Sequence, residues 1–96
     1  MNQPLTVGRI VHFVLAEDGA GKPVVRPAIV VQTWSPGTAN LQVFSDGNND
    51  DRLVNEHEKA SRGPDKTTRC VLWRTSVTED PEGKRIGSWH WPPRSP

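Results

Sequence analysis

The sequence predicts a small all-β protein, a five-stranded antiparallel barrel or bent sheet with one long polar loop. The chain has 96 residues, which is the length of one domain, here residues 1–96. Its apolar segments are short and rich in Val and Ile, and 8 Gly and 9 Pro are spread through the chain. Five short strands are too few for an immunoglobulin-sized sandwich, so we expect a small barrel or a strongly bent sheet.

The first three predicted strands form a meander. Residues 8–15 are too β-branched for a good helix, and they end at a turn-forming segment that contains two glycines. Residues 26–34 follow, and the apolar run 28–31 within them predicts a central strand covered on both faces. After the turn at 35–38, residues 40–44 alternate in polarity and predict a half-buried third strand.

Residues 45–69 form the long polar loop, which exceeds the ordinary length of a connection in a compact domain. Loops of this length are usually functional or mobile. Within the loop, residues 49–60 have the composition of a possible short helix, with Asp50 or Asp51 as its cap.

The last two predicted strands are residues 70–77 and 86–91, joined through the turn at 80–83. Prolines then prevent further pairing, and residues 93–96 are expected to form a flexible tail. Cys70 is the single cysteine, so an internal disulfide is excluded. It opens an apolar stretch, which favours a small buried thiol over a nucleophile.

The composition excludes several partners. A formal net charge of +1 supplies no protein-wide field for long nucleic acid or an anionic membrane. No apolar run of the sequence approaches the length of a membrane span, which is ~18 residues, and the charged and then apolar pattern of a signal peptide is absent. A cytoplasmic location is therefore expected. A sheet this small and polar often completes its burial with a copy of itself, which favours a homo-oligomer.

The sequence carries no standard catalytic or metal-binding motif, so we assign no catalytic residue, metal or cofactor. The segment that starts at Asp46 resembles a calcium loop, yet its twelfth position is His57 where such a loop needs Glu, and a solvated turn is favoured. His12 and His90 would share one face near a pocket if their strands pair, but for His12 alone a structural role is favoured.

The C-terminal segment 87–92, Gly-Ser-Trp-His-Trp-Pro, is the most informative part of the chain. If it is extended, Trp89 and Trp91 point to one face and His90 to the other. At least two of the four tryptophans are expected in the core, which leaves the others for recognition. Aromatic faces bind flat rings, and arginines bind phosphate. The candidate ligand-binding residues are His12, Arg26, Trp34, Trp73, Arg74, Arg85, Trp89, His90 and Trp91.

Four segments together, 9–14, 26–31, 40–47 and 87–92, resemble a group of short, uncharacterised proteins of tailed bacteriophages that end in Gly-Ser/Thr-Trp-His-Trp-Pro. The resemblance covers most of the chain outside the long loop and carries no catalytic residues. It implies a phage accessory protein that acts in the infected bacterial cell.

Three functions are compatible with these residues. The first is a sponge that sequesters a nucleotide-derived immune signal, a cyclic oligonucleotide or an ADP-ribose derivative, without cleaving it, and so inhibits anti-phage defence. The second is a virion or host-protein-binding module that uses the Trp-rich C-terminal strand, because interface hot spots favour Trp and Arg. The third is a small phosphodiesterase that uses His12 and His90 as an acid–base pair.

Overall fold

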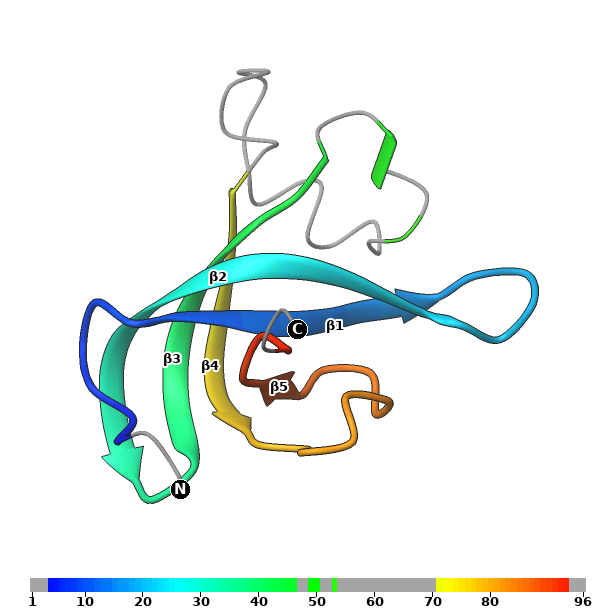
Figure 1. Cartoon of the computed structure of the whole chain (residues 1–96). Helices are drawn as coiled ribbons and strands as arrows, with labels where there is room; N and C mark the ends of the chain where they lie inside the picture. Colours follow the sequence, from blue (N-terminus) through cyan, green and yellow to red (C-terminus); the bar gives the residue numbers. More distant parts are fainter. Residues whose placement is uncertain (1–3, 47–48, 51–52, 54–70, 94–96) are drawn as a thin grey trace.

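The computed structural model describes residues 4–46, 49–50, 53 and 71–93, which fold around one antiparallel sheet (Figure 1). The strand order is β4-β3-β2-β1-β5. This confirms the predicted all-β class, and because the sheet is not closed, it takes the form of a bent sheet. The strands are β1 (Ile10–Glu17), β2 (Pro23–Ser35), β3 (Thr38–Phe44), β4 (Val71–Thr78) and β5 (Trp89–His90).

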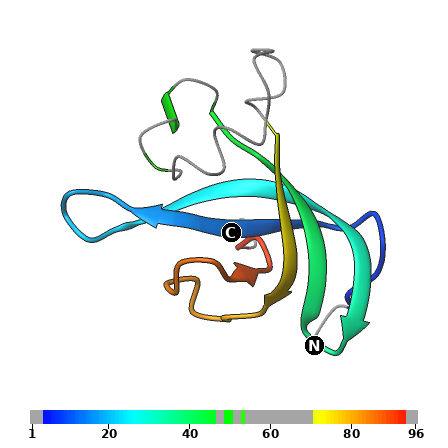
Figure 2. The ribbon, with the colours of Figure 1, turned by 180° about the vertical axis from the view of Figure 1, so that it is seen from behind.

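Strand β2 is the longest and bends strongly along its length, as both views show (Figures 1 and 2). Its pairing with β3 shifts register twice, between Val30 and Gln32 and between Thr33 and Ser35. Such irregularities let a strand bend and twist, so the sheet curves around its inner face. The residues after β4 therefore come beside β5, where the Asp80 N–H donates to the Trp89 carbonyl at 2.8 Å.

The core lies on the inner face of this bent sheet. All five strands contribute to it, and its side chains are at most 5 % exposed: Val11, Phe13, Leu15, Ala28, Val30, Ala39, Leu41, Val43, Leu72, Val77 and Trp89. The core residues of β1, β2 and β3 alternate along each strand, which is the period-two pattern of a sheet with one packed face; Val14 of β1 and Asn40 of β3 are buried in addition to them.

The predicted coverage of residues 28–31 on both faces is wrong. Strand β2 is the middle strand of the sheet, but Val31 is 40 % exposed and Ile29 is only half-buried, whereas Val30 between them is 1 % exposed. The continuous apolar run indicated burial on both sides. An antiparallel sheet needs only one packed face, and in the part of the chain that is described no second layer covers the outer face.

The C-terminal strand is shorter than the predicted 86–91. Only Trp89 and His90 form β5, which pairs with Phe13 and His12 of β1. Gly87 precedes them with a φ of +83°, a left-handed conformation that removes it from regular strand geometry.

Several predictions fall on residues that are not described. The Cys70 thiol, His57, the tail residues 94–96 and most of the loop 45–69 with its possible helix lie outside the described residues. Within the described residues, no helix has the length and apolar character that a membrane span requires.

Candidate functional site

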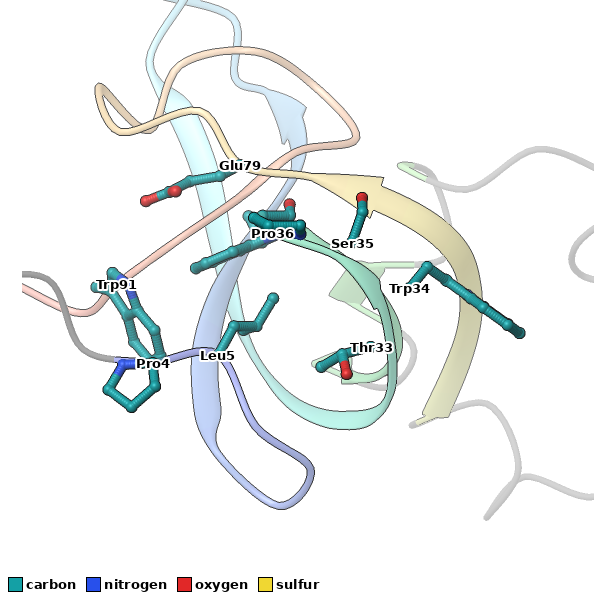
Figure 3. A pocket seen from close by; sticks show the side chains of 10 residues that line it. Pro4, Leu5, Thr33, Trp34, Ser35, Pro36, Glu79 and Trp91 are labelled. Atoms are coloured by element: carbon teal, nitrogen blue, oxygen red, sulfur yellow. The ribbon is translucent and has the colours of Figure 1, made fainter.

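A cavity of about 470 Å³ lies where the N-terminal segment, the β2–β3 turn and the C-terminal segment meet (Figure 3). We call it the tryptophan pocket. Two of the four tryptophans contribute their rings to it, and the other apolar lining comes from prolines and one leucine. The lining residues are Pro4, Leu5, Thr33, Trp34, Ser35, Pro36, Gly37, Glu79, Trp89 and Trp91.

Trp89 anchors the pocket to the core. Its side chain is 1 % exposed, and its indole N–H donates to the Gly37 carbonyl at 2.9 Å. Gly37 has a φ of +83°, which lets the two-residue turn after β2 reverse the chain against the indole. Because a buried indole N–H needs a partner, this bond fixes the turn relative to β5. The innermost wall of the pocket is therefore rigid.

Trp91 provides the second aromatic wall and is half-buried. Its ring stands perpendicular to that of Trp89, with the centroids 5.3 Å apart and an interplanar angle of 86°. The Arg9 guanidinium lies over the Trp91 ring, 5.4 Å from the centroid. These contacts restrain the ring, and they show that it accepts a cation on one face.

Trp34 belongs to the pocket only through the part of the residue near the backbone. Figure 3 shows its side chain pointing away from Trp91, Pro4 and Leu5. The indole N–H donates to the Asn40 Oδ1 at 2.8 Å, and the ring is 62 % exposed. Trp34 therefore offers a solvent-facing ring on a different side of the β2–β3 hairpin.

Among the described residues that line the pocket, Glu79 is the one that carries a charge. Its backbone N–H donates to the Gly37 carbonyl at 2.9 Å, and Glu79 forms an isolated parallel bridge with Trp89. Among the described residues, no side chain pairs with its carboxylate. The pocket thus combines apolar and aromatic walls with a single unneutralised negative charge.

All three arginines that the sequence predicted as phosphate-binding residues lie outside the pocket. Arg26 binds the Asp50 carboxylate through Nε at 2.7 Å and Nη2 at 2.8 Å, and these bonds raise the pKa of Arg26. Arg74 lies over the Phe13 ring, with Cζ 5.5 Å from the centroid. Arg85 donates to the Thr78 Oγ1 at 2.6 Å.

Trp73 also lies outside the pocket. It projects from β4, the edge strand of the sheet, and its side chain is 51 % exposed. The four predicted tryptophans therefore divide into Trp89 and Trp91, which meet at the pocket, and Trp34 and Trp73, which face solvent elsewhere.

His12 and His90 are brought together, as the pairing of their strands requires. They are direct partners in the β1–β5 register, and their rings meet edge to face with centroids 5.6 Å apart. Neither ring lines the tryptophan pocket. Because the two rings contact each other, a phosphate has no room between them, which weighs against an acid–base pair acting from opposite sides of one phosphorus.

His90 occupies a tight site beside Gly83. A Cβ added to Gly83 would lie 3.0 Å from the His90 ring, and the φ of +69° there also favours glycine. The His90 Nδ1 is buried and has no hydrogen-bond partner. Burial lowers the pKa of His90, the neighbouring His12 lowers it further, and Asp80 acts in the opposite direction.

This lowered pKa predicts a loss of stability in mild acid. Because the folded pKa lies below the unfolded value of about 6.5, the unfolded chain binds more protons as the pH falls through that value. The urea midpoint is therefore expected to be lower at about pH 5.5 than at about pH 7.5. Urea titrations of the wild type and of His90→Gln at both values check this; an equal drop in the variant would assign the effect to other groups.

Within the described residues, no group of three metal-binding side chains comes together. Asp46 and Asp50, from the segment that resembles a calcium loop, are linked instead by a hydrogen bond from the Asp46 N–H to the Asp50 Oδ2 at 2.7 Å. Asp50 is also the buried partner of Arg26.

Leu5, Pro36 and Glu79 line the pocket but were not predicted as site residues from the sequence. A Pro-Gly turn between two strands, next to a tryptophan, was visible in the sequence, but nothing there indicated that the chain ends would converge on this turn. Glu79 directly follows β4, and only the bend of the sheet brings it beside Trp89.

Fold and site together define a small bent-sheet β protein with an aromatic pocket where residues 4–5, the β2–β3 turn and β5 meet. No protein-family model matches this chain, and no curated protein or solved structure matches it at a significant level. Its function is therefore argued from the pocket itself.

Proposed function

We propose that this protein is a binding module that docks a segment of a partner protein in the tryptophan pocket. The observation that carries the proposal is the pairing of a fixed indole, Trp89, with a partly accessible one, Trp91, in a cavity of about 470 Å³. Tryptophan is enriched among the residues that dominate binding energy at protein interfaces, especially where it is rigid and central.

The rest of the lining supports a peptide as the ligand. Pro4, Leu5 and Pro36 add apolar walls, and the hydroxyls of Thr33 and Ser35 add hydrogen-bonding groups. Grooves lined by aromatic side chains recognise extended, proline-containing segments, which lose little conformational entropy on binding. Such a module would bind its partner protein through the Trp-rich C-terminal strand, as in the second function compatible with the sequence.

Sequestration of a nucleotide-derived signal is the second candidate. Arg9 beside Trp91 favours it, because a base stacked on an indole gains about 1–3 kcal/mol and a guanidinium binds phosphate. Glu79 opposes it, since its charge repels a phosphate in the same cavity. A homo-oligomer that brings arginines of a second copy to the pocket would offset this repulsion.

The first test is a selection of displayed peptides. A yeast-displayed library of random peptides is sorted for binding to the full chain, and the enriched peptides are titrated against wild type, Trp91→Ala and Trp73→Ala. We expect peptides that bind wild type and Trp73→Ala alike but lose at least about tenfold in affinity, or about 1.4 kcal/mol, with Trp91→Ala. Loss of binding in Trp73→Ala instead, or no enrichment, would overturn the proposal.

A nucleotide panel tests the second candidate. Cyclic dinucleotides and ADP-ribose are added in thermal-shift measurements, where a ligand at 100 times its dissociation constant stabilises by about 2.7 kcal/mol. A shift without any enriched peptide would replace the first proposal by the second. Heat release of the bound compound then separates sequestration, which returns it intact, from catalysis, which returns it altered.

A further inference from the structure

We infer that the tryptophan pocket takes a cationic side chain, with Glu79 as its counter-ion and Trp91 as its stacking surface. The partner segment would thus carry an arginine or a lysine where it enters the pocket. This inference rests on the proposed function and names the chemistry of the residue that the pocket recognises.

The charge of the pocket is the first argument. Within the described part of the lining, Glu79 alone carries a charge, and no described side chain neutralises its carboxylate. Figure 3 shows the Glu79 side chain extending toward the side of the pocket where Trp91 lies. A neutral ligand that filled the pocket would remove water from this carboxylate without replacing it, whereas a cationic ligand would pair with it.

The Trp91 ring is the second argument. The face of an indole carries partial negative charge, and tryptophan is the aromatic residue that binds cations best. The chain already places the Arg9 guanidinium 5.4 Å from the Trp91 centroid. The long apolar stem of arginine or lysine would contact Leu5 and the prolines while its charged end reached Glu79.

The geometry of Glu79 is the third argument. Its backbone N–H and the Trp89 indole N–H both donate to the Gly37 carbonyl, each at 2.9 Å. One carbonyl thus fixes the backbone of the acidic residue relative to the inner aromatic wall. Because these positions are set before binding, the Glu79 backbone and the inner aromatic wall need no rearrangement when a ligand enters.

Defined peptides test the inference. The probe is a fluorescently labelled pentapeptide with arginine between two pairs of prolines, and the matched probe replaces arginine with citrulline, its neutral isostere. By fluorescence anisotropy, we expect the wild type to bind the arginine probe at least about tenfold more tightly. Glu79→Gln should remove this difference, while Glu82→Gln, a change at an acidic side chain that is 75 % exposed, should retain it.

The outcomes separate the inference from the proposed function. If both probes bind wild type equally and require Trp91, the cation inference is overturned and the binding module stands. If neither pentapeptide binds, the peptides from the library decide: enrichment of arginine or lysine that Glu79→Gln abolishes supports the inference, and enrichment without basic residues overturns it. If no peptide binds at all, both proposals fail.

Discussion

Replacing Trp89 with alanine is expected to lower the free energy of unfolding by about 3–5 kcal/mol, the cost of truncating a large buried aromatic side chain. Trp89 is 1 % exposed, packs in the core and bonds the Gly37 carbonyl. The variant loses this packing, and the turn loses its link to β5. Because a small domain has roughly 5–15 kcal/mol of stability in total, the variant loses a large share of its stability, and its urea midpoint should fall clearly below that of the wild type.

Urea denaturation followed by far-ultraviolet circular dichroism measures this loss without depending on indole fluorescence. Trp73→Ala is the matched control, since it removes the same side chain from a position that is 51 % exposed and should change stability by no more than about 0.5 kcal/mol. A loss below about 1 kcal/mol in Trp89→Ala would show that the indole is not central to the core.

Trp89 is unsuitable for tests of function, whereas Trp91 and Glu79 are suitable. At Trp89 the fold and the pocket depend on one side chain, so a loss of binding there cannot be separated from unfolding. Trp91 is half-buried and Glu79 lies at the surface of the pocket, so their variants separate binding from stability. We therefore place the binding experiments on these two residues.

The sequence predicted the architecture well because its signals were local. Alternation in residues 40–44, β-branched residues in 10–14 and Gly or Pro between the strands each act over a few residues. The predicted antiparallel sheet is confirmed, and the strands of His12 and His90, whose pairing the sequence left open, are neighbours. The outer face of β2 was misjudged because an apolar run indicates burial but does not say what covers it.

The site was less predictable because it depends on how the sheet bends. The alternation in Trp89-His90-Trp91 correctly placed the two tryptophans together, whereas the contact of His90 with His12 follows from the pairing of β5 with β1. The spatial separation of arginines from indoles depends on long-range contacts, such as Arg26 with Asp50, and no local pattern encodes these. Trp34 shows the same limit, since one hydrogen bond to Asn40 directs its ring away from the pocket.

Replacing Arg26 with methionine is expected to destabilise the fold by about 3 kcal/mol, because it breaks a buried ion pair on one side only. Asp50 is 2 % exposed, and its carboxylate accepts two hydrogen bonds from Arg26 and one from the Asp46 N–H. Without the guanidinium, the Asp50 carboxylate loses two hydrogen bonds and the positive charge of Arg26. The Arg26 side chain is 26 % exposed, so water reaches the site. The loss of stability should therefore lie near the lower end of the range for buried ion pairs that lose one partner.

A double-mutant cycle separates this pairing from the loss of the Arg26 stem. Arg26→Met, Asp50→Asn and the double variant are compared by urea denaturation. Because the double variant carries no unpaired charge, it should be less destabilised than the sum of the two single variants, with a coupling of about 1–3 kcal/mol. Additive losses would mean that the two side chains contribute independently. In that case Arg26 would be open to a ligand, and the phosphate-binding role that the sequence predicted for it would return as the better explanation.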